Sequence, residues 1–269
     1  MDQEVLEKEF RTVEWDAKSA EKGGFEHFML KEIYEQPKAV ADTIHPRIKD
    51  GKIVIEELGL SDEDIRKISR IQMVACGSAY HVCAAAKYVL EKLSGIPVDI
   101  DLASEFRYRN PILSEHTLVV IVSQSGETAD SLAALRESKK RGFPVLGIVN
   151  VVGSSIAREA DSVFYTWAGP EISVATTKAY STQLAAIYLI GILFGEVREC
   201  ISREEADHYI QELLSFRKKF SGSSMKKSGF SGWPTNFPYE GCLFHRKRTG
   251  LCDFHGRFPE AQGNFLYPF

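Results

Sequence analysis

The chain has 269 residues and a formal net charge of −4 at pH 7. This acidic balance argues against a nucleic acid or an anionic membrane surface as the partner, because binding to either depends on a basic patch. The length allows one or two domains with a sizeable core, which is enough for an enzyme.

The cysteines Cys76, Cys83 and Cys200 follow no disulfide pattern. The first residues contain no basic segment followed by an apolar one, as a secretory signal would require. We therefore expect a reduced, cytoplasmic protein. Cys76 and Cys83 are interpreted as small buried residues.

The N-terminal part of the chain begins with a polar, charged stretch, residues 1–24, that ends in a Gly-Gly pair. This composition is typical of a linker. From Phe25 to Ile44 apolar residues recur at helical spacing, and Pro37 interrupts them. The pattern predicts one kinked helix or two short helices.

Apolar runs then alternate with helical segments. The predicted strands are Ile71–Ala75, Val98–Leu102, Leu118–Ser123, Val145–Asn150 and Ser162–Thr166, with helices near 79–94, 127–141 and 155–160. This alternation predicts right-handed crossovers and one parallel sheet of about five strands, a three-layer α/β/α fold of the flavodoxin-like type.

A last long helix, Ala175–Glu196, should cover one face of the sheet. Its apolar stretch from Leu184 to Phe194 is broken by Gly191. The stretch is too short to span a bilayer, which needs about 20 helical residues. We expect a buried core helix.

The loop from Ser123 to Thr128 is the most informative segment, because it joins a buried strand to a helix. Parallel sheets bind ligands at the carboxyl ends of their strands. Ser123, Ser125 and Thr128 offer hydroxyl groups, and Gly126 allows close backbone approach. Together with the amides that open the next helix, the loop predicts an anion site, and we expect the anion to be a phosphate. The alternative is that Ser125 or Thr128 caps the helix, with Glu127 completing the cap.

Two further loops should lie at the same edge of the sheet. Residues 76–80, Cys-Gly-Ser-Ala-Tyr, form another turn rich in glycine and hydroxyl groups that opens a helix. Residues 171–178 precede the long helix and end in Lys178. Lys178 is either a counter-charge for the ligand or a solvent-exposed residue at the start of the helix.

These segments resemble one family when they are taken together. The motifs are Cys76-Gly77-Ser78, Ala103 to Arg109, Ser123 to Thr128 and Val174 to Ala179. In this order they resemble glutamine:fructose-6-phosphate aminotransferase (isomerizing), also called glucosamine-6-phosphate synthase. The likeness runs from about Val13 to about Leu214 and covers the linker and the first of two sugar isomerase (SIS) domains. We therefore divide the chain into a linker with N-terminal helices (1–45), a SIS domain (46–215) and an irregular tail (216–269).

The resemblance implies a sugar-phosphate site for fructose 6-phosphate or glucosamine 6-phosphate. By family, Ser123, Gln124, Ser125 and Thr128 hold the phosphate, and Ser78, Ala79 and Val174 line the sugar. A hydroxyl residue often stands in the family where this chain has Ala79, so the sugar contacts there are expected to be weaker. We expect no cofactor and no metal.

The resemblance also implies that the chain lacks catalytic residues. The family takes its cysteine nucleophile from an N-terminal glutaminase domain, and a glutamate, a histidine and lysines from its second SIS domain. We therefore expect a catalytically incomplete fragment of the aminotransferase. The alternative is a stand-alone regulatory module that binds sugar phosphates.

The tail changes composition from Phe216, and no helix or strand pattern is predicted beyond that residue. Paired Cys-x-x-His units at Cys242 to His245 and at Cys252 to His255 could supply four ligands to zinc, although the interval between the pairs is short for a zinc finger.

The other interpretation of the tail is a shifted reading frame. Back-translating 245–269 with permitted codons and moving by one base gives IGKGLDYAISMEGSLKLREISYIH, which resembles the opening of the family's second SIS domain. Moving the stretch from Phe216 by two bases gives PEKIQREFDEEERIQRMADKF, a charged helical sequence. We hypothesise that small insertions or deletions scrambled the tail, so that its cysteines and histidines are accidental.

Glu105, Arg107 and Arg109 are charged residues of the second motif, just after a predicted strand. We interpret them as a cluster of ion pairs that is structural or belongs to a dimer interface. A homodimer through the SIS domain is the expected assembly.

Overall fold

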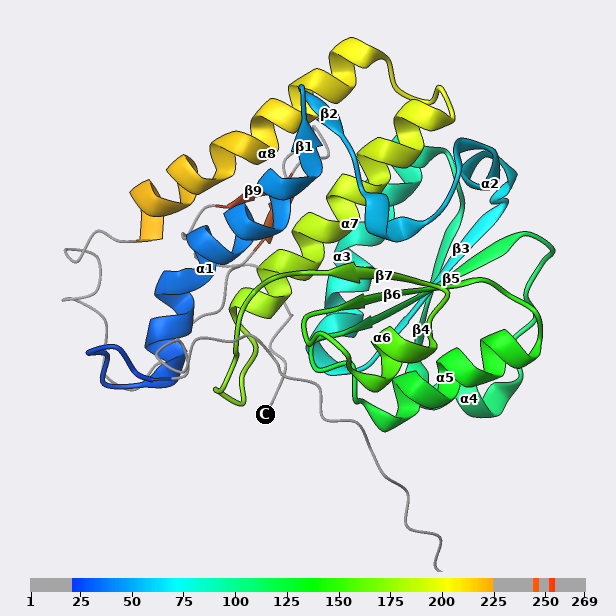
Figure 1. Ribbon diagram of the computed structural model, residues 1–269, viewed down its shortest axis with the longest axis horizontal. Helices are drawn as coiled ribbons and strands as arrows, with labels where there is room; N and C mark the ends of the chain where they lie inside the picture. Colours follow the sequence, from blue (N-terminus) through cyan, green and yellow to red (C-terminus); the bar gives the residue numbers. More distant parts are fainter. Residues whose placement is uncertain (1–20, 225–243, 247–251, 255–269) are drawn as a thin grey trace, which may run out of the picture. The chain divides into compact units, whose positions relative to one another are not determined.

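The computed structural model describes residues 21–224, 244–246 and 252–254, with side-chain environments up to residue 215. The chain divides into two compact units, Met1–Arg217 and Lys218–Phe269. The first unit contains the sheet and the helices that cover it (Figure 1).

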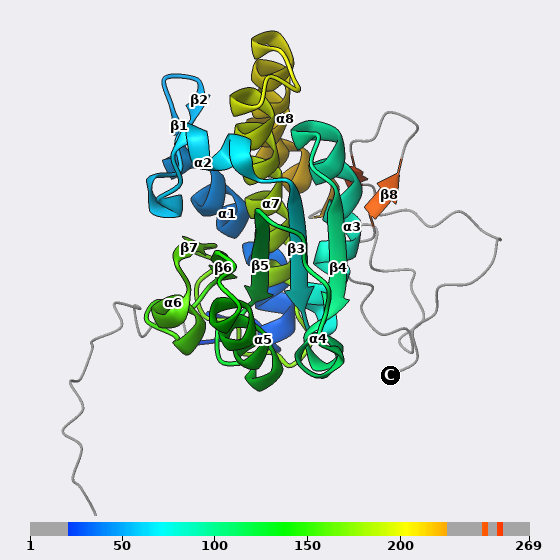
Figure 2. The ribbon, with the colours of Figure 1, turned by 90° about the vertical axis from the view of Figure 1, so that its right-hand side faces the viewer.

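A five-stranded sheet forms the centre of the first unit. Its strands are β3 (Arg70–Ala75), β4 (Val98–Leu102), β5 (Thr117–Ser123), β6 (Val145–Val149) and β7 (Ser162–Tyr165). They lie in the order β4-β3-β5-β6-β7, and every neighbouring pair is parallel (Figure 2). All residues of β5 and β6 are buried, as continuous apolar runs in a covered parallel sheet require. The predicted flavodoxin-like sheet is confirmed, with strand ends that differ by one residue at most.

Helices cover both faces of the sheet. On one face lie α3 (Gly77–Ser94) and α7 (Lys178–Val197), with α1 (Phe28–Ile44) packed along α7. On the other lie α4 (Ala103–Arg109), α5 (Ala129–Lys140) and α6 (Ser155–Glu159). One core cluster joins this second layer to the sheet through Phe106, Leu135 and Ile156. The three-layer α/β/α architecture is therefore confirmed.

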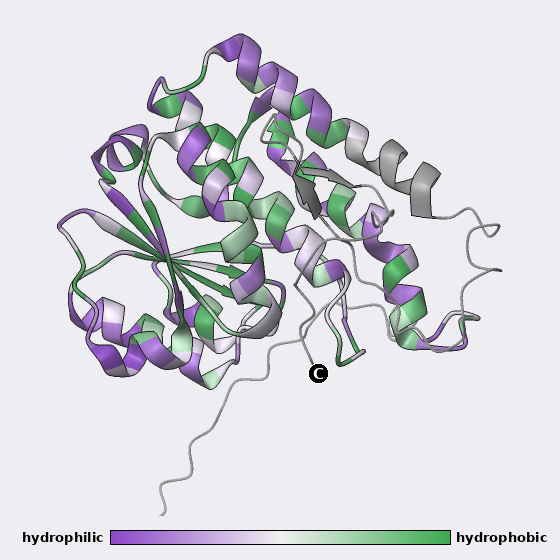
Figure 3. Cartoon of the chain, turned by 180° about the vertical axis from the view of Figure 1, so that it is seen from behind, coloured by the Kyte–Doolittle hydropathy of each residue, from purple (hydrophilic) through white to green (hydrophobic). Residues whose placement is uncertain are grey.

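Helix α7 is the one helix in the described part of the chain that is long and apolar enough to cross a membrane, judged by length and composition alone. Its most apolar window is 72% buried, and it packs between α1 and α3. Figure 3 shows apolar residues on α7 and the strands, and polar residues on the outer surfaces of the helices. The structure confirms the predicted core helix.

The N-terminal segment forms one α-helix, α1, in which Pro37 is tolerated. After it come η2 (His45–Arg47), a hairpin of β1 (Ile48–Lys49) and β2 (Lys52–Ile53), η3 (Glu56–Leu58) and α2 (Asp62–Lys67). Arg47 anchors this segment: its buried guanidinium donates to the Thr43 carbonyl and the Tyr165 carbonyl, both at 2.6 Å. Burial lowers the pKa of Arg47, while its pairing with Glu57 opposes this shift.

The chain continues into α8 (Arg203–Ser224), where Ala206 and Ile210 are buried. The helix runs past Phe216, so the expectation of no helix beyond that residue is wrong. Residues 216–224 contain no proline, and the helix continues through them although Gly222 disfavours it. In the second unit, β8 (Phe244–Arg246) pairs antiparallel with β9 (Cys252–Phe254), a second departure from that expectation.

Candidate functional site: the carboxyl edge of the sheet

The loops after β3 and β5 are neighbours, because these strands pair in parallel with Ala75 opposite Val122. The loop after β7 lies at the same edge of the sheet, two strands further along. Parallel strands thus bring together the three loops that the sequence singled out.

The loop from Ser123 to Thr128 is folded by its own hydroxyl groups. The backbone amide of Gly126 donates to Ser123 Oγ at 3.1 Å, and Ser123 Oγ lies 3.1 Å from Thr128 Oγ1. Ser125 Oγ accepts from the amide of Glu127 at 3.2 Å. Ser123 is buried, whereas Gln124, Ser125 and Thr128 are partly exposed and can meet a ligand from solvent.

The alternative that these residues merely cap α5 is wrong. Thr128 occupies the N-cap position, but its side chain makes no capping hydrogen bond. The carboxylate of Glu127 instead accepts from the amide of Ser155, 2.7 Å away at the start of α6. The positive end of α5 is therefore left without the cap that Thr128 or Glu127 could have supplied, which favours an anion there.

Gly126 is required at the centre of this loop for two reasons. Its φ of +67° is a conformation that side chains disfavour, and a Cβ there would overlap the hydroxyl of Ser154. The amide of Ile156 donates to the carbonyl of Gly126 at 3.0 Å, so the start of α6 holds the loop in place. Ser154 Oγ is buried without a hydrogen-bond partner among the described residues.

Ser78 and Ala79 open α3 beside this loop. Gly77 has a φ of +55°, and the N-cap residue Cys76 makes no side-chain cap. Ser78 is exposed and Ala79 is partly exposed. Ser131 Oγ lies 4.0 Å from the sulfur of Cys76, so the loop after β3 contacts the first turn of α5. Cys83, further along α3, is buried as predicted, and burial raises its pKa.

Asn150, at the end of β6, connects the neighbouring loops. Its backbone amide donates to the carbonyl of Gln124 at 3.1 Å. Its side chain accepts from the amide of Ala168 at 2.7 Å and donates to the carbonyl of Gly169 at 2.8 Å. This role was not predicted from the sequence, although a polar residue that ends a buried strand is a signal for it.

The third loop, residues 171–177, carries Val174, which is fully exposed. Two carboxylates hold this loop. Glu171 accepts from the amides of Thr177 and Ala179, at 2.9 and 3.2 Å, and so caps α7. Glu32 of α1 accepts from the amides of Ile172 and Ser173, at 2.7 and 3.0 Å.

Both interpretations of Lys178 from the sequence fail. Its side chain is buried, and its Nζ lies 2.7 Å from Glu35 of α1. It is therefore neither in solvent nor free to act as a counter-charge, because an ion pair between helices already uses it.

The predicted cluster of Glu105, Arg107 and Arg109 consists of separate contacts. Arg107 pairs with Asp130 of α5 at 2.7 Å, and Arg109 donates from Nε to Asp101 at 2.8 Å. Glu105 is exposed, and no ion pair in the described part of the chain includes it. These contacts tie α4 to its neighbours, while the expected dimer interface stays a prediction.

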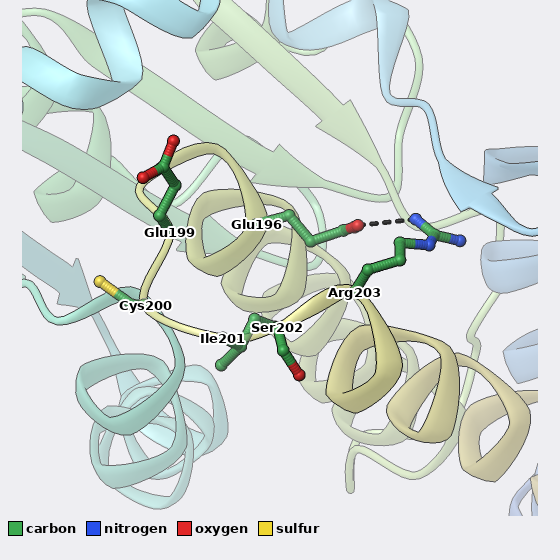
Figure 4. Close-up of a pocket in the computed structure, with 6 residues that line it drawn as sticks. All are labelled: Glu196, Glu199, Cys200, Ile201, Ser202 and Arg203. Carbon is green, nitrogen blue, oxygen red and sulfur yellow. Dashed lines mark hydrogen bonds and ion pairs between the residues drawn. The ribbon is translucent and has the colours of Figure 1, made fainter.

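A hollow of about 450 Å³ lies elsewhere, at the turn between α7 and α8 (Figure 4). It is lined by Glu196, Glu199, Cys200, Ile201, Ser202 and Arg203. The sulfur of Cys200 lies 3.2 Å from the carbonyl of Ser94, which precedes β4. The hollow is therefore near the amino edge of the sheet, opposite the three loops, and it contains none of the predicted site residues.

No group of three or more potential metal ligands occurs among the residues that the structure describes. Cys242 and His255 of the predicted zinc site lie outside the described residues. The zinc hypothesis therefore stays a prediction, as does the shifted reading frame.

The sheet order and the loops at its carboxyl edge define the class of protein. The chain matches the SIS domain family over residues 64–193. Over 217 residues it is 53% identical to glutamine–fructose-6-phosphate aminotransferase (isomerizing) from Clostridium acetobutylicum. That alignment covers 80% of this chain and 36% of the relative, so the chain spans about a third of the length of the curated relatives it matches.

Solved structures give the same result. The C-terminal domain of glucosamine-fructose-6-phosphate aminotransferase from Francisella tularensis is 41% identical with a TM-score of 0.70, over 74% of this chain and 55% of that chain. Glucosamine-6-phosphate deaminase from Thermotoga maritima, 22% identical with a TM-score of 0.55 over 72% of this chain and 55% of that chain, shares the fold alone. The resemblance indicated by the sequence motifs is confirmed.

Proposed function

We propose that the carboxyl edge of the sheet binds a sugar phosphate, fructose 6-phosphate or glucosamine 6-phosphate. The observation that carries the proposal is the N-terminus of α5, which has no side-chain cap. Ser125 and Thr128 lie beside this positive end of the helix. Hydroxyl groups, backbone amides and a helix N-terminus together suit a phosphate dianion. The identity of the proposed sugar comes from the names of the relatives, which are fructose-6-phosphate aminotransferases.

In this proposal the phosphate lies against Ser123, Gln124, Ser125 and Thr128, and the sugar extends toward Ser78, Ala79 and Val174. Because Ser123 is buried and its Oγ accepts from the amide of Gly126, its role is to shape the loop. Ser125 and Thr128 contribute the side-chain donors. Val174, whose side chain is fully exposed, can pack against the apolar face of the sugar.

We infer that the chain corresponds to the sugar-phosphate-binding part of a cytoplasmic glutamine:fructose-6-phosphate aminotransferase. None of its assigned site residues is a catalytic base. As a stand-alone regulatory module it would bind the same ligands. Formation of glucosamine 6-phosphate from fructose 6-phosphate and glutamine, measured with the full chain, separates a complete enzyme from both a fragment and a module.

The first test is calorimetric titration of the full chain with fructose 6-phosphate, glucosamine 6-phosphate and unphosphorylated fructose. We expect saturable binding of the phosphorylated sugars only. Replacing Ser125 or Thr128 by alanine removes one hydrogen bond to a charged group, worth about 1.5–3 kcal/mol, and should weaken binding about 10- to 100-fold.

Ser162→Ala is the matched control, because Ser162 begins β7 at the opposite edge of the sheet and this change should leave the affinity unaltered. Equal binding of fructose and fructose 6-phosphate would contradict the proposal. Unchanged affinity in both loop variants would contradict the assignment of the phosphate to this loop.

A further inference from the structure

The side chain of Glu32, in the segment before the SIS domain, is buried under the loop of residues 171–177. It is only 2% exposed. Its carboxylate accepts from the backbone amides of Ile172 and Ser173, at 2.7 and 3.0 Å, and from the hydroxyl of Ser173. A buried carboxylate that accepts three hydrogen bonds fixes the groups that donate them.

Helix α1 holds this carboxylate in place through contacts with α7. Glu35 pairs with the buried Nζ of Lys178 at 2.7 Å. The hydroxyl of Ser181 donates to Gln36 at 2.6 Å. These contacts come from the turn of α1 that follows Glu32, so the position of the carboxylate is set by packing between two long helices.

The loop itself has little else to hold it. Ile172 is 45% exposed and Val174 is fully exposed, so apolar burial contributes little to the conformation of 172–174. In the described part of the chain, one other hydrogen bond involves these three residues, from the Ser173 hydroxyl to the carbonyl of Ala175. The conformation that presents Val174 therefore depends mainly on Glu32.

We propose that Glu32 is a positioning residue for the sugar: it sets the loop of residues 172–174 so that Val174 lines the sugar site. The inference deepens the proposed function and rests on it. Since α1 lies outside residues 64–193, the SIS domain receives this part of its site from the segment that precedes it. Phosphate binding by the loop after β5 does not involve Glu32.

The test compares Glu32→Gln and Ser173→Ala with the wild-type full chain. Hydrogen exchange of the amides of Ile172 and Ser173 measures how firmly the loop is held. Titration with inorganic phosphate measures binding at the loop after β5 alone, and titration with fructose 6-phosphate measures binding of phosphate and sugar together. We expect exchange at both amides to accelerate about tenfold or more in Glu32→Gln, since a charge-assisted acceptor is lost. Affinity for fructose 6-phosphate should fall about tenfold, while affinity for inorganic phosphate stays the same.

Val40→Ala is the matched control, because Val40 is a buried residue of α1 that lies two turns beyond Glu32 and is not among the partners of the loop. It should lower stability without changing the ratio of the two affinities. Equal loss of both affinities in Glu32→Gln, or the same change of ratio in Val40→Ala, would overturn the proposal. If the wild type binds neither ligand, the proposed function fails, and unchanged amide exchange in Glu32→Gln would separately refute the role of Glu32.

Discussion

In Glu171, burial of the carboxylate and its capping of α7 shift the pKa in opposite directions. Burial raises its pKa, the amides of Thr177 and Ala179 act in the opposite direction, and the nearby carboxylate of Glu32 raises it further. The net shift is upward, so the folded protein holds this proton to a higher pH than the unfolded chain does. Between the two pKa values the native state binds more protons, and its stability therefore falls as the pH rises.

We predict that the free energy of unfolding of the wild type, minus that of Glu171→Gln, falls as the pH rises above the ordinary glutamate pKa of about 4.3. Urea denaturation of both proteins at a series of pH values measures this difference. Glu56→Gln is the control with the opposite slope, because Lys49 lowers the pKa of exposed Glu56 and the stability this adds is lost as the pH falls. A difference for Glu171 that rises with pH would mean that the amides outweigh burial.

Single residues show where sequence reasoning about the site succeeds and where it stops. Ser125 and Thr128 could be placed at the carboxyl edge of the sheet because a buried strand, a loop and a helix follow one another locally. The partner of Lys178 could not be found, since Glu35 is far away in sequence and the two meet only when α1 packs on α7. Glu32 was missed for the same reason, although a charged residue on the buried side of a helix is a signal.

At the scale of elements, α3 and α7 approach closely because α7 carries two glycines one turn apart. A Cβ on Gly195 would lie 2.5 Å from the backbone carbonyl oxygen of Leu93, closer than any real contact. A Cβ on Gly191 would meet the ends of the Leu93 and Leu90 side chains, at 3.2 and 3.3 Å, and the backbone of Leu90 only at an ordinary 3.8 Å. Side-chain ends can move, whereas the backbone at the end of α3 cannot without shifting the helix.

We predict that Gly195→Ala destabilises the protein by about 1–3 kcal/mol through overpacking, despite alanine's better helix propensity. Gly191→Ala should change stability little, because a propensity gain of about 1 kcal/mol offsets the tighter contact. Thermal or urea denaturation of the two variants measures both effects, and each variant serves as the other's control. Equal stability of the two would show that α3 and α7 can separate at no cost.

The strands of the sheet and its long helices were predictable, but of the short helices only α6 was. Apolar periodicity over three or more turns revealed α1, α3 and α7. By contrast, α2 buries only Ile65, and α4 buries only Ala103 and Phe106. So few apolar residues do not form a helical repeat that can be recognised in the sequence. Helix α8 was not predicted, and the change of composition at Phe216 was taken to exclude a helix that continues to Ser224.

At the scale of the whole molecule, the order of the sheet follows from the alternation of strands and helices, which leaves few topologies open. The contact of α1 with α7 could not be predicted in this way. It joins segments more than a hundred residues apart through the Glu35–Lys178 ion pair and other side chains. That contact makes α1, which the sequence analysis grouped with the linker, part of the same compact unit as the sheet.

The last prediction concerns the gene. The alignment to the Clostridium acetobutylicum relative covers four fifths of the chain, so about a fifth lies outside it. We expect resequencing through the codons of Phe216 to Phe269 to reveal small insertions or deletions that restore family-like sequence in one continuous frame. The reason is that back-translation with permitted codons, read in the shifted frames, gives a charged helical sequence and then a SIS-like opening, in family order. Confirmation of the tail as written would contradict this hypothesis, and zinc content, with and without Cys242→Ser, would then decide whether the Cys-x-x-His pairs bind metal.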